Sequence, residues 1–136
     1  MTIGKRKIIV SSLISLLLLL SLFVSVASAE SSKFDCSFAG FQCKGVNVFS
    51  YGTHFNHSDY VYATRGQVLA VSNQSDGPFN LVTQLVDLFG TPISSEIAFT
   101  DTQFIAVPRE GSYRVKVTCM DSSASKRCLG RGSVSQ

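Results

Sequence analysis

The chain has 136 residues, of which 45% are apolar, and it carries 12 basic and 9 acidic side chains. Residues 1–29 hold three of the basic side chains, so the other 107 residues are formally neutral, with nine basic and nine acidic groups. Neutrality excludes the broad positive field of a general nucleic-acid-binding protein. The length excludes two large domains or a cofactor-binding α/β enzyme, and we expect one small domain without a cofactor.

The first 29 residues have the three-part pattern of an export signal. A Lys-Arg-Lys group at positions 5–7 precedes an apolar run, and Ala-Ser-Ala at 27–29 forms a cleavage triplet. We expect cleavage at this triplet, so that Glu30 begins a mature, secreted protein. The alternative is a retained membrane anchor, because residues 8–27 are long enough to span a bilayer. The leucine-rich leader is typical of bacterial export signals.

All four cysteines lie in the mature part of the chain, at Cys36, Cys43, Cys119 and Cys128. In an oxidising compartment an even number predicts two disulfides, for which three connectivities are possible. The short separations favour the local pairs Cys36–Cys43 and Cys119–Cys128. The alternative connectivity joins the two ends of the domain and closes longer loops. No pair has the Cys-x-x-Cys spacing of a zinc site, so we expect the thiols to be structural.

Apolar and polar residues alternate in the mature chain with the two-residue period of β-strands, and turn signals rich in Gly, Pro, Asp and Ser separate the runs. The expected strands are 46–51, 59–64, 67–73, 79–87, 93–99, 103–107 and 113–119. The last run is the clearest, because Tyr113 and three further apolar residues share one face while Arg114 and Lys116 share the other.

About seven short strands at this spacing predict an all-β domain, an antiparallel β-sandwich of jelly-roll or immunoglobulin-like type. We expect the domain to span residues 30–120. Residues 121–136 are rich in Ser and basic side chains, which predicts a flexible basic tail. Basic residues are concentrated after position 110, among them Arg114, Lys116 and Arg131, and they allow contact with an anionic wall or membrane as an alternative to a solvated tail.

Four segments follow one another in a recognisable order between Asp59 and Cys119. They are Asp-Tyr-Val-Tyr at 59–62, Gly-Gln-Val-Leu-Ala-Val at 66–71, Leu-Val-Asp-Leu-Phe-Gly at 85–90 and Val-Pro-Arg-Glu-Gly-Ser-Tyr-Arg-Val at 107–115. Together they resemble the bacterial pre-peptidase C-terminal (PPC) type of β-sandwich domain, although the cysteines depart from that family's pattern. Such domains accompany secreted enzymes as non-catalytic modules, so the resemblance implies a non-catalytic β-sandwich.

The densest group of chemically versatile side chains lies between residues 49 and 62. Three interpretations are open: rings that plug one end of the sandwich, an aromatic recognition surface, and a metal site formed by His54, His57 and Asp59. We expect no metal, because a third ligand at such short spacing is common by chance. The predicted ligand-binding residues are Tyr51, His54, Phe55, His57, Tyr60 and Tyr62.

The sequence contains no Gly-x-Ser-x-Gly, His-Glu-x-x-His or phosphate-binding glycine motif, so we expect no enzyme. It predicts a secreted binding or surface-interaction module whose partner is an extracellular protein or a cell-surface component, not nucleic acid. Membrane contact is expected only through an uncleaved leader or peripherally. Two other functions stay open: a toxin-like or antimicrobial protein that acts on membranes, and a small hydrolase using His57 with Asp59. We expect the glycosylation sequons at Asn56 and Asn73 to be bare.

Overall fold

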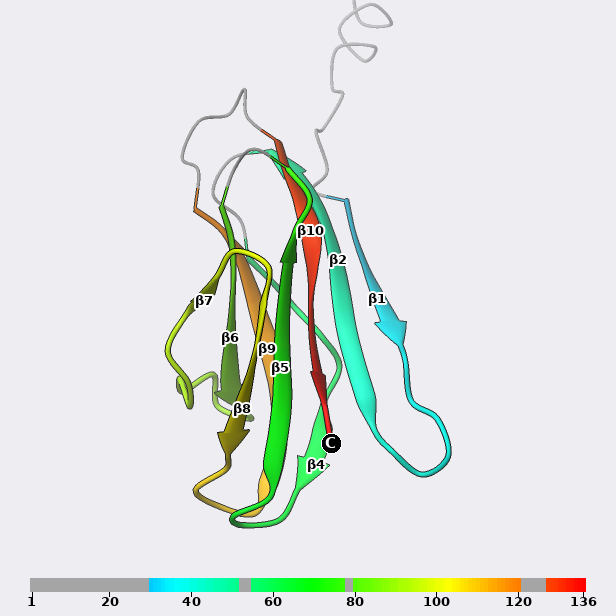
Figure 1. Cartoon of the computed structure of the whole chain (residues 1–136), viewed down its shortest axis with the longest axis vertical. Helices are drawn as coiled ribbons and strands as arrows, with labels where there is room; N and C mark the ends of the chain where they lie inside the picture. Colours follow the sequence, from blue (N-terminus) through cyan, green and yellow to red (C-terminus); the bar gives the residue numbers. More distant parts are fainter. Residues whose placement is uncertain (1–29, 52–54, 78–79, 121–126) are drawn as a thin grey trace, which may run out of the picture.

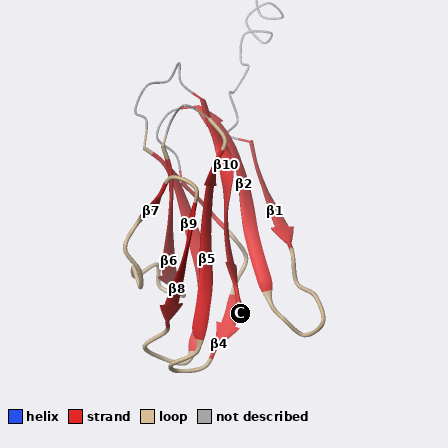
Figure 2. Cartoon of the chain, in the orientation of Figure 1, coloured by secondary structure: helices blue, strands red, loops and turns tan. Residues whose placement is uncertain are grey.

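The computed structural model describes residues 30–51, 55–77, 80–120 and 127–136, and the regular structure in these ranges is all β-strand (Figure 2). The predicted leader, residues 1–29, lies outside them. Ten strands in the described ranges form two antiparallel sheets that face each other (Figure 1). The predicted all-β sandwich is therefore confirmed. No helix in the part of the chain that the structure describes has the length and apolarity to span a bilayer.

The two sheets have different strand orders. The sheet that we call the front sheet has the order β1-β2-β10-β5-β8, with bounds β1 (Glu30–Asp35), β2 (Cys43–Tyr51), β5 (Val68–Ser75), β8 (Asp101–Ala106) and β10 (Arg127–Ser135). The back sheet has the order β3-β9-β6-β7, with β4 also paired to β9, and its bounds are β3 (Phe55–His57), β4 (Val61–Ala63), β6 (Leu81–Asp87), β7 (Ile97–Ala98) and β9 (Gly111–Cys119).

The chain crosses between the sheets at six of the nine connections between the described strands. After β2 it enters the back sheet for β3 and β4, returns for β5, crosses again for β6 and β7, and returns for β8 before β9 and β10 complete the two sheets. The strand order β2-β10-β5-β8 facing β4-β9-β6-β7 is that of a jelly roll. Of the two sandwich types that the sequence predicts, the structure has this one.

Each of the seven predicted strands overlaps an observed strand, and β1, β3 and β10 were not predicted. The predicted flexible tail is wrong for residues 127–135, because β10 lies in the middle of the front sheet and pairs with both β2 and β5. The predicted domain end at residue 120 is wrong for the same reason. Residues 121–126 lie outside the described ranges.

Two glycines explain how β10 reaches the middle of the sheet. Gly130 and Gly132 are buried and face the back sheet. A Cβ on Gly132 would lie 2.4 Å from Val117 Cγ2 and 2.5 Å from Thr83 Oγ1, and a Cβ on Gly130 would lie 2.8 Å from Leu81 Cδ2. Side chains of the back sheet thus occupy the space in front of Gly132, whereas the nearest atom to a Cβ on Gly130 would be the backbone oxygen of Gln74 in neighbouring β5, at 2.1 Å. The two sheets approach closely at β10.

A buried hydrogen-bonded pair joins the sheets beside this contact. Asn73 of β5 is 1% exposed, and its Nδ2 donates to the carbonyl oxygen of Leu81 at 2.8 Å. Thr83 of β6 is fully buried and donates its hydroxyl to Asn73 Oδ1 at 2.7 Å. These bonds satisfy polar groups that would otherwise destabilise the core. They also bury the amide of one sequon, which is not accessible to a glycan in the folded domain.

The favoured disulfide connectivity is confirmed. Cys36–Cys43 closes the hairpin between β1 and β2, with its Cα atoms 4.9 Å apart. Cys119–Cys128 joins β9 of the back sheet to β10 of the front sheet, with its Cα atoms 5.9 Å apart, and both of its cysteines are fully buried. Paired cysteines are typical of exported proteins.

Candidate functional site

The four predicted ligand-binding residues whose side chains the structure describes, Phe55, His57, Tyr60 and Tyr62, do not form one surface. β3 and β4 pair with opposite ends of β9, so Phe55 and His57 lie far along the back sheet from Tyr62. His54 and the side chain of Tyr51 lie outside what the structure describes. The prediction of a single aromatic contact loop is therefore not matched by the described residues, which divide into two groups.

The first group is the aromatic–cation surface of the back sheet, formed by Phe55, His57, Tyr60, Arg114 and Lys116. The rings of Phe55 and His57 meet edge to face, with centroids 5.5 Å apart. Lys116 Nζ lies 4.7 Å from the Phe55 ring centroid, and Arg114 Cζ lies 4.8 Å from the Tyr60 centroid. Both cations are thus engaged by rings of the same chain.

At this surface His57 and Asp59, the pair that a small hydrolase would use, have separate partners. Burial lowers the pKa of His57 below its ordinary value of 6.5, and the positive charges of Arg114, Lys116 and Lys33 lower it further. Asp59 forms an ion pair with Lys33, whose Nζ lies 2.8 Å from Oδ1, and no hydrogen bond among the described residues joins Asp59 to His57. The carboxylate therefore neutralises a lysine and does not orient the imidazole.

The remaining predicted residue, Tyr62, is held at the start of β9. Its hydroxyl donates to Glu110 Oε1, and this hydrogen bond, with some burial and the negative charge, raises the pKa of Tyr62 above 10.0. Its backbone N–H donates to Gln42 Oε1 at 2.9 Å, and Gln136 Nε2 donates to its carbonyl oxygen at 2.5 Å. Tyr62 thus fastens three segments of the chain to one another.

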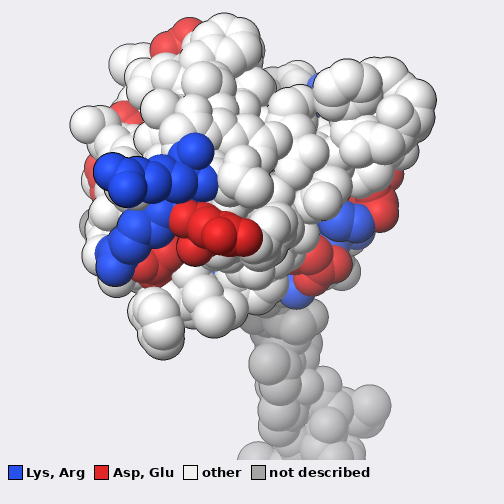
Figure 3. Space-filling view, turned by 90° about the horizontal axis from the view of Figure 1, so that it is seen from below, with Lys and Arg blue, Asp and Glu red and all other residues white. Residues whose placement is uncertain are grey.

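The basic residues that the sequence groups together are separated in space. Arg114 and Lys116 lie on β9 in the back sheet, whereas Arg131 lies on β10 in the front sheet. Seen from below, basic and acidic side chains lie next to each other in small groups on a largely uncharged surface (Figure 3). Among the described residues, no group of three His, Cys, Asp or Glu side chains is placed to hold a metal ion.

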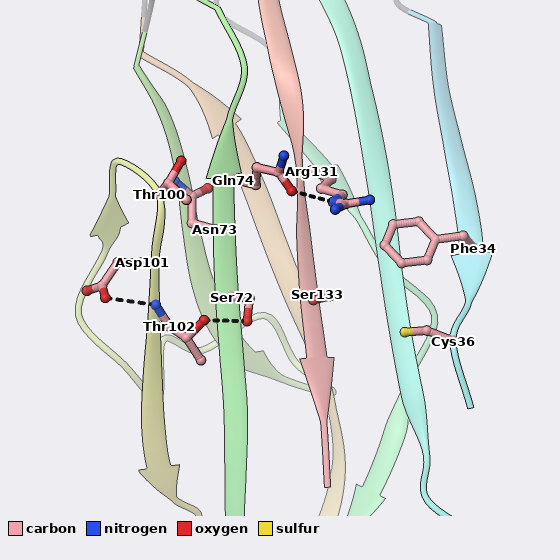
Figure 4. Close-up of a pocket in the computed structure, with 10 residues that line it drawn as sticks. All are labelled: Phe34, Cys36, Ser72, Asn73, Gln74, Thr100, Asp101, Thr102, Arg131 and Ser133. Atoms are coloured by element: carbon pink, nitrogen blue, oxygen red, sulfur yellow. Dashed lines mark hydrogen bonds between the residues drawn. The ribbon is translucent and has the colours of Figure 1, made fainter. Parts of the chain in front are cut away.

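A second site, which the sequence did not reveal, lies on the outer face of the front sheet (Figure 4). It is an open groove of about 610 Å³. One lateral row of paired residues crosses all five strands along it: Thr102 of β8, Ser72 of β5, Ser133 of β10, Gly45 of β2 and Phe34 of β1. Three hydroxyl groups thus lie on neighbouring strands at one end of the row, and an aromatic ring lies at the other end. With strands about 4.8 Å apart, the row spans about 19 Å.

A parallel row of longer polar side chains borders the first. It consists of Gln74, Arg131, Asn47 and Ser32, on β5, β10, β2 and β1. Arg131 Nε donates to Gln74 Oε1 at 2.7 Å, and Asn47 Nδ2 donates to Ser32 Oγ at 3.3 Å. Of this second row, Gln74 and Arg131 line the groove with an amide and a guanidinium, and Asn47 and Ser32 continue the row over β2 and β1.

The small residues in the first row give the groove its shape. The Phe34 ring lies over Gly45, where its Cζ is 2.2 Å from the position that a Cβ would occupy. The hydroxyls of Ser72 and Thr102 share a hydrogen bond of 2.8 Å, and Ser133 makes no side-chain hydrogen bond to the residues that the structure describes. The groove therefore offers hydroxyl groups with free bonding capacity beside a fixed ring.

The fold and this groove define a jelly-roll β-sandwich with a polar groove across one sheet. No family model matches the sequence, and no curated protein shows significant similarity to it. The resemblance to PPC domains therefore stays a prediction.

Among solved structures, similar chains include a periplasmic inhibitor of g-type lysozyme from Aeromonas hydrophila (19% identity, TM-score 0.46, covering 80% of this chain and 89% of that one). They also include the C-terminal family 6 carbohydrate-binding module of a laminarinase from Zobellia galactanivorans (10% identity, TM-score 0.44, 79% and 100% covered). A family 61 carbohydrate-binding module solved with β-1,4-galactotriose has 12% identity and a TM-score of 0.39, with 76% and 83% covered. Similarities this distant transfer no function to the chain.

Proposed function

We propose that this chain is an exported, non-catalytic binding module that holds a carbohydrate chain in the groove of the front sheet. The proposal rests on the two rows of side chains in the groove. Three hydroxyl groups and the Phe34 ring, which lies over Gly45, are next to amide and guanidinium groups. Sugars have hydroxyl donors and acceptors at their edges and apolar C–H groups on their ring faces. Convergent polar side chains beside an aromatic ring complement both features.

The size and openness of the groove fit a chain-like ligand. Its volume of about 610 Å³ lies in the range of small-ligand pockets. A row of about 19 Å across the strands is long enough for a short oligosaccharide to lie over several strands at once. The groove is open to solvent, which suits a chain-like ligand better than an enclosed cavity would.

The chemistry of the lining supports binding without catalysis. Asp101 is the one carboxylate among the described lining residues, whereas the common mechanisms of glycoside hydrolysis require two. His57 lies on the back sheet, next to Arg114 and Lys116. The groove therefore presents hydrogen-bonding groups and a ring, without a pair of groups suited to acid–base catalysis.

The proposal is tested by electrophoresis of the purified, disulfide-bonded protein in gels that contain neutral or acidic polysaccharides. We expect retardation by at least one polysaccharide. Phe34→Ala is expected to weaken it by about tenfold, the effect of losing one aromatic contact. Phe89→Ala is the matched control, because Phe89 is 89% exposed and lies outside the groove. Unchanged circular dichroism shows that Phe34→Ala is folded.

Two results would overturn the proposal. One is the absence of retardation by every polysaccharide in the panel. The other is a folded Phe34→Ala variant that binds as tightly as Phe89→Ala, because the groove would then not be the site.

A further inference from the structure

Arg131 is held in a fixed orientation within the groove. Its Nε donates to Gln74 Oε1 at 2.7 Å, and Gln74 Nε2 in turn donates to Asp76 Oδ1 at 2.8 Å. These bonds use one edge of the guanidinium. Its two terminal nitrogens make no hydrogen bond or ion pair with the residues that the structure describes, and Arg131 is exposed, so these nitrogens are accessible to a ligand. Arg131 thus presents oriented donors, and no carboxylate among the described residues is in direct contact with its charge.

The terminal nitrogens of Arg131 point across β2 toward Phe34 (Figure 4). Arg131 is paired with Asn47 of β2. Two residues further along β2, the ring of Phe34 from β1 lies over Gly45. A side chain at position 45 would displace this ring. A charged planar donor and an aromatic ring therefore border the same stretch of β2.

The opposite end of the groove has the opposite charge. Asp101 of β8 is exposed, and its Oδ1 accepts a hydrogen bond from the backbone N–H of Thr102 at 2.8 Å. β8 lies two strands from β10, about 10 Å away at the usual strand spacing. An anion is therefore favoured at the Arg131 end and disfavoured at the Asp101 end.

We infer that the bound glycan carries a uronic acid at the Arg131–Phe34 end and that it lies in the groove in one direction only. This inference rests on the proposed function. A carboxylate fits the edge of a guanidinium with two parallel hydrogen bonds. Because a uronic acid bears its carboxylate on the sugar ring itself, the ring contacts Phe34 while the carboxylate reaches Arg131. Asp101 then faces a neutral sugar, whose hydroxyls donate to it.

The test uses ligands that differ only in charge. Amide shifts of the ¹⁵N-labelled protein are followed during titration with methyl glycosides of glucuronic and galacturonic acid, and with the carboxyl methyl esters of both. We expect one of the acids to bind about tenfold more tightly than its ester, with shifts at Phe34, Gly45 and Arg131. A hexoside 6-sulfate is titrated as a second anion.

Variants assign the preference to individual residues. Arg131→Gln is expected to reduce the difference in affinity between acid and ester from about tenfold to less than about twofold, and Arg131→Lys to restore only part of it, because an ammonium lacks the planar fork. Asp101→Asn is expected to strengthen binding of the acid. Arg114→Gln on the back sheet is the matched control and is expected to behave like the wild type.

The outcomes separate this inference from the proposed function. If acid and ester bind equally, or if Arg131→Gln keeps the preference, the uronic acid assignment is overturned while glycan binding stands. If the sulfate binds as tightly as the acids, the site is a general anion site and the assignment of a carboxylate is overturned. If neither the glycosides nor any polysaccharide shifts the groove amides, the proposed function fails as well.

Discussion

The outer faces of the two sheets carry similar residue types and use them differently. On the back sheet, Arg114 and Lys116 lie over the rings of Tyr60 and Phe55, and Arg114 Nε, which lacks a hydrogen-bond partner among the described residues, is buried. On the front sheet, Arg131 is oriented through one edge and keeps its terminal donors available. Aromatic and basic residues by themselves therefore do not mark a binding site. A binding site is better indicated by side chains that the fold holds in one orientation and whose exposed donors or acceptors have no partner in the chain.

The comparison of the two faces assumes that both sheets unfold together as one cooperative unit. Removal of the disulfide between the sheets is the test with the largest expected effect. We expect Cys119→Ala/Cys128→Ala to lower the free energy of unfolding by about 2–4 kcal/mol in urea denaturation. Cys36→Ala/Cys43→Ala removes a disulfide of similar loop length that is only half-buried, so we expect a smaller loss. An equal or larger loss for the hairpin pair would contradict the role assigned to the inter-sheet bond.

The close approach at β10 is the next way to disturb both faces together. In Gly132→Ala the added Cβ meets Val117 and Thr83 at 2.4–2.5 Å, and overpacking of this kind costs about 1–3 kcal/mol of stability. Ser133→Ala, the neighbouring residue on the groove side, is expected to stay within about 0.5 kcal/mol of the wild type. Thermal unfolding measures both. A Gly132→Ala variant as stable as Ser133→Ala would show that the sheets have room to spare at β10.

A pair of arginine variants sharpens the contrast between the faces. Arg114→Gln removes a cation–π contact and is expected to lower stability by about 0.5–1 kcal/mol without affecting polysaccharide binding. Arg131→Gln is expected to weaken binding of an acidic glycan while stability changes by less than about 0.5 kcal/mol. Chemical denaturation and gel retardation of both variants give the result. The contrast is contradicted if the two arginines exchange these effects.

The smallest predicted effect is the titration of His57, measured by NMR. Its folded pKa is lowered, so the unfolded chain binds more protons between the folded pKa and 6.5, and the free energy of unfolding falls as the pH falls through this range. Lys116→Gln is expected to raise the folded pKa, because it removes a neighbouring positive charge. Arg131→Gln, on the other sheet, should leave it unchanged. A His57 pKa above 6.5 would contradict the environment described for the back sheet.

Alternation is clearest in the predicted strands that have one solvated face, such as β5 and β9. In β5, Leu69 and Val71 are fully buried, whereas Val68, the first residue of the strand, is 49% exposed. In β9, Val115 and Val117 are fully buried and the residue between them is partly exposed. The sequence missed β10 because its inward positions include Gly130 and Gly132, which sequence patterns treat as breakers. Here Gly132 is small because Val117 and Thr83 of the opposite sheet fill its space, and Gly130 because Gln74 of β5 and Leu81 of the opposite sheet leave no room for a Cβ. This is a property of tertiary packing and not of local propensity.

The groove was beyond reach of the sequence for a related reason. Its first row draws on positions 34, 45, 72, 102 and 133, which lie in five different strands and become neighbours only through the strand order and register. No local spacing connects them. Conversely, Phe55 and Tyr62 are close in sequence, but pairing of β3 and β4 with opposite ends of β9 separates them.

The position of β10 also affects when the sheet becomes complete. It follows every other described strand in chain order, yet it fills the gap between β2 and β5. Until residues 127–135 arrive, those two strands have no common neighbour, and neither row of the groove is continuous. A chain that has emerged only as far as residue 120 therefore lacks the strand that completes the front sheet, and the groove forms only once residues 127–135 are available.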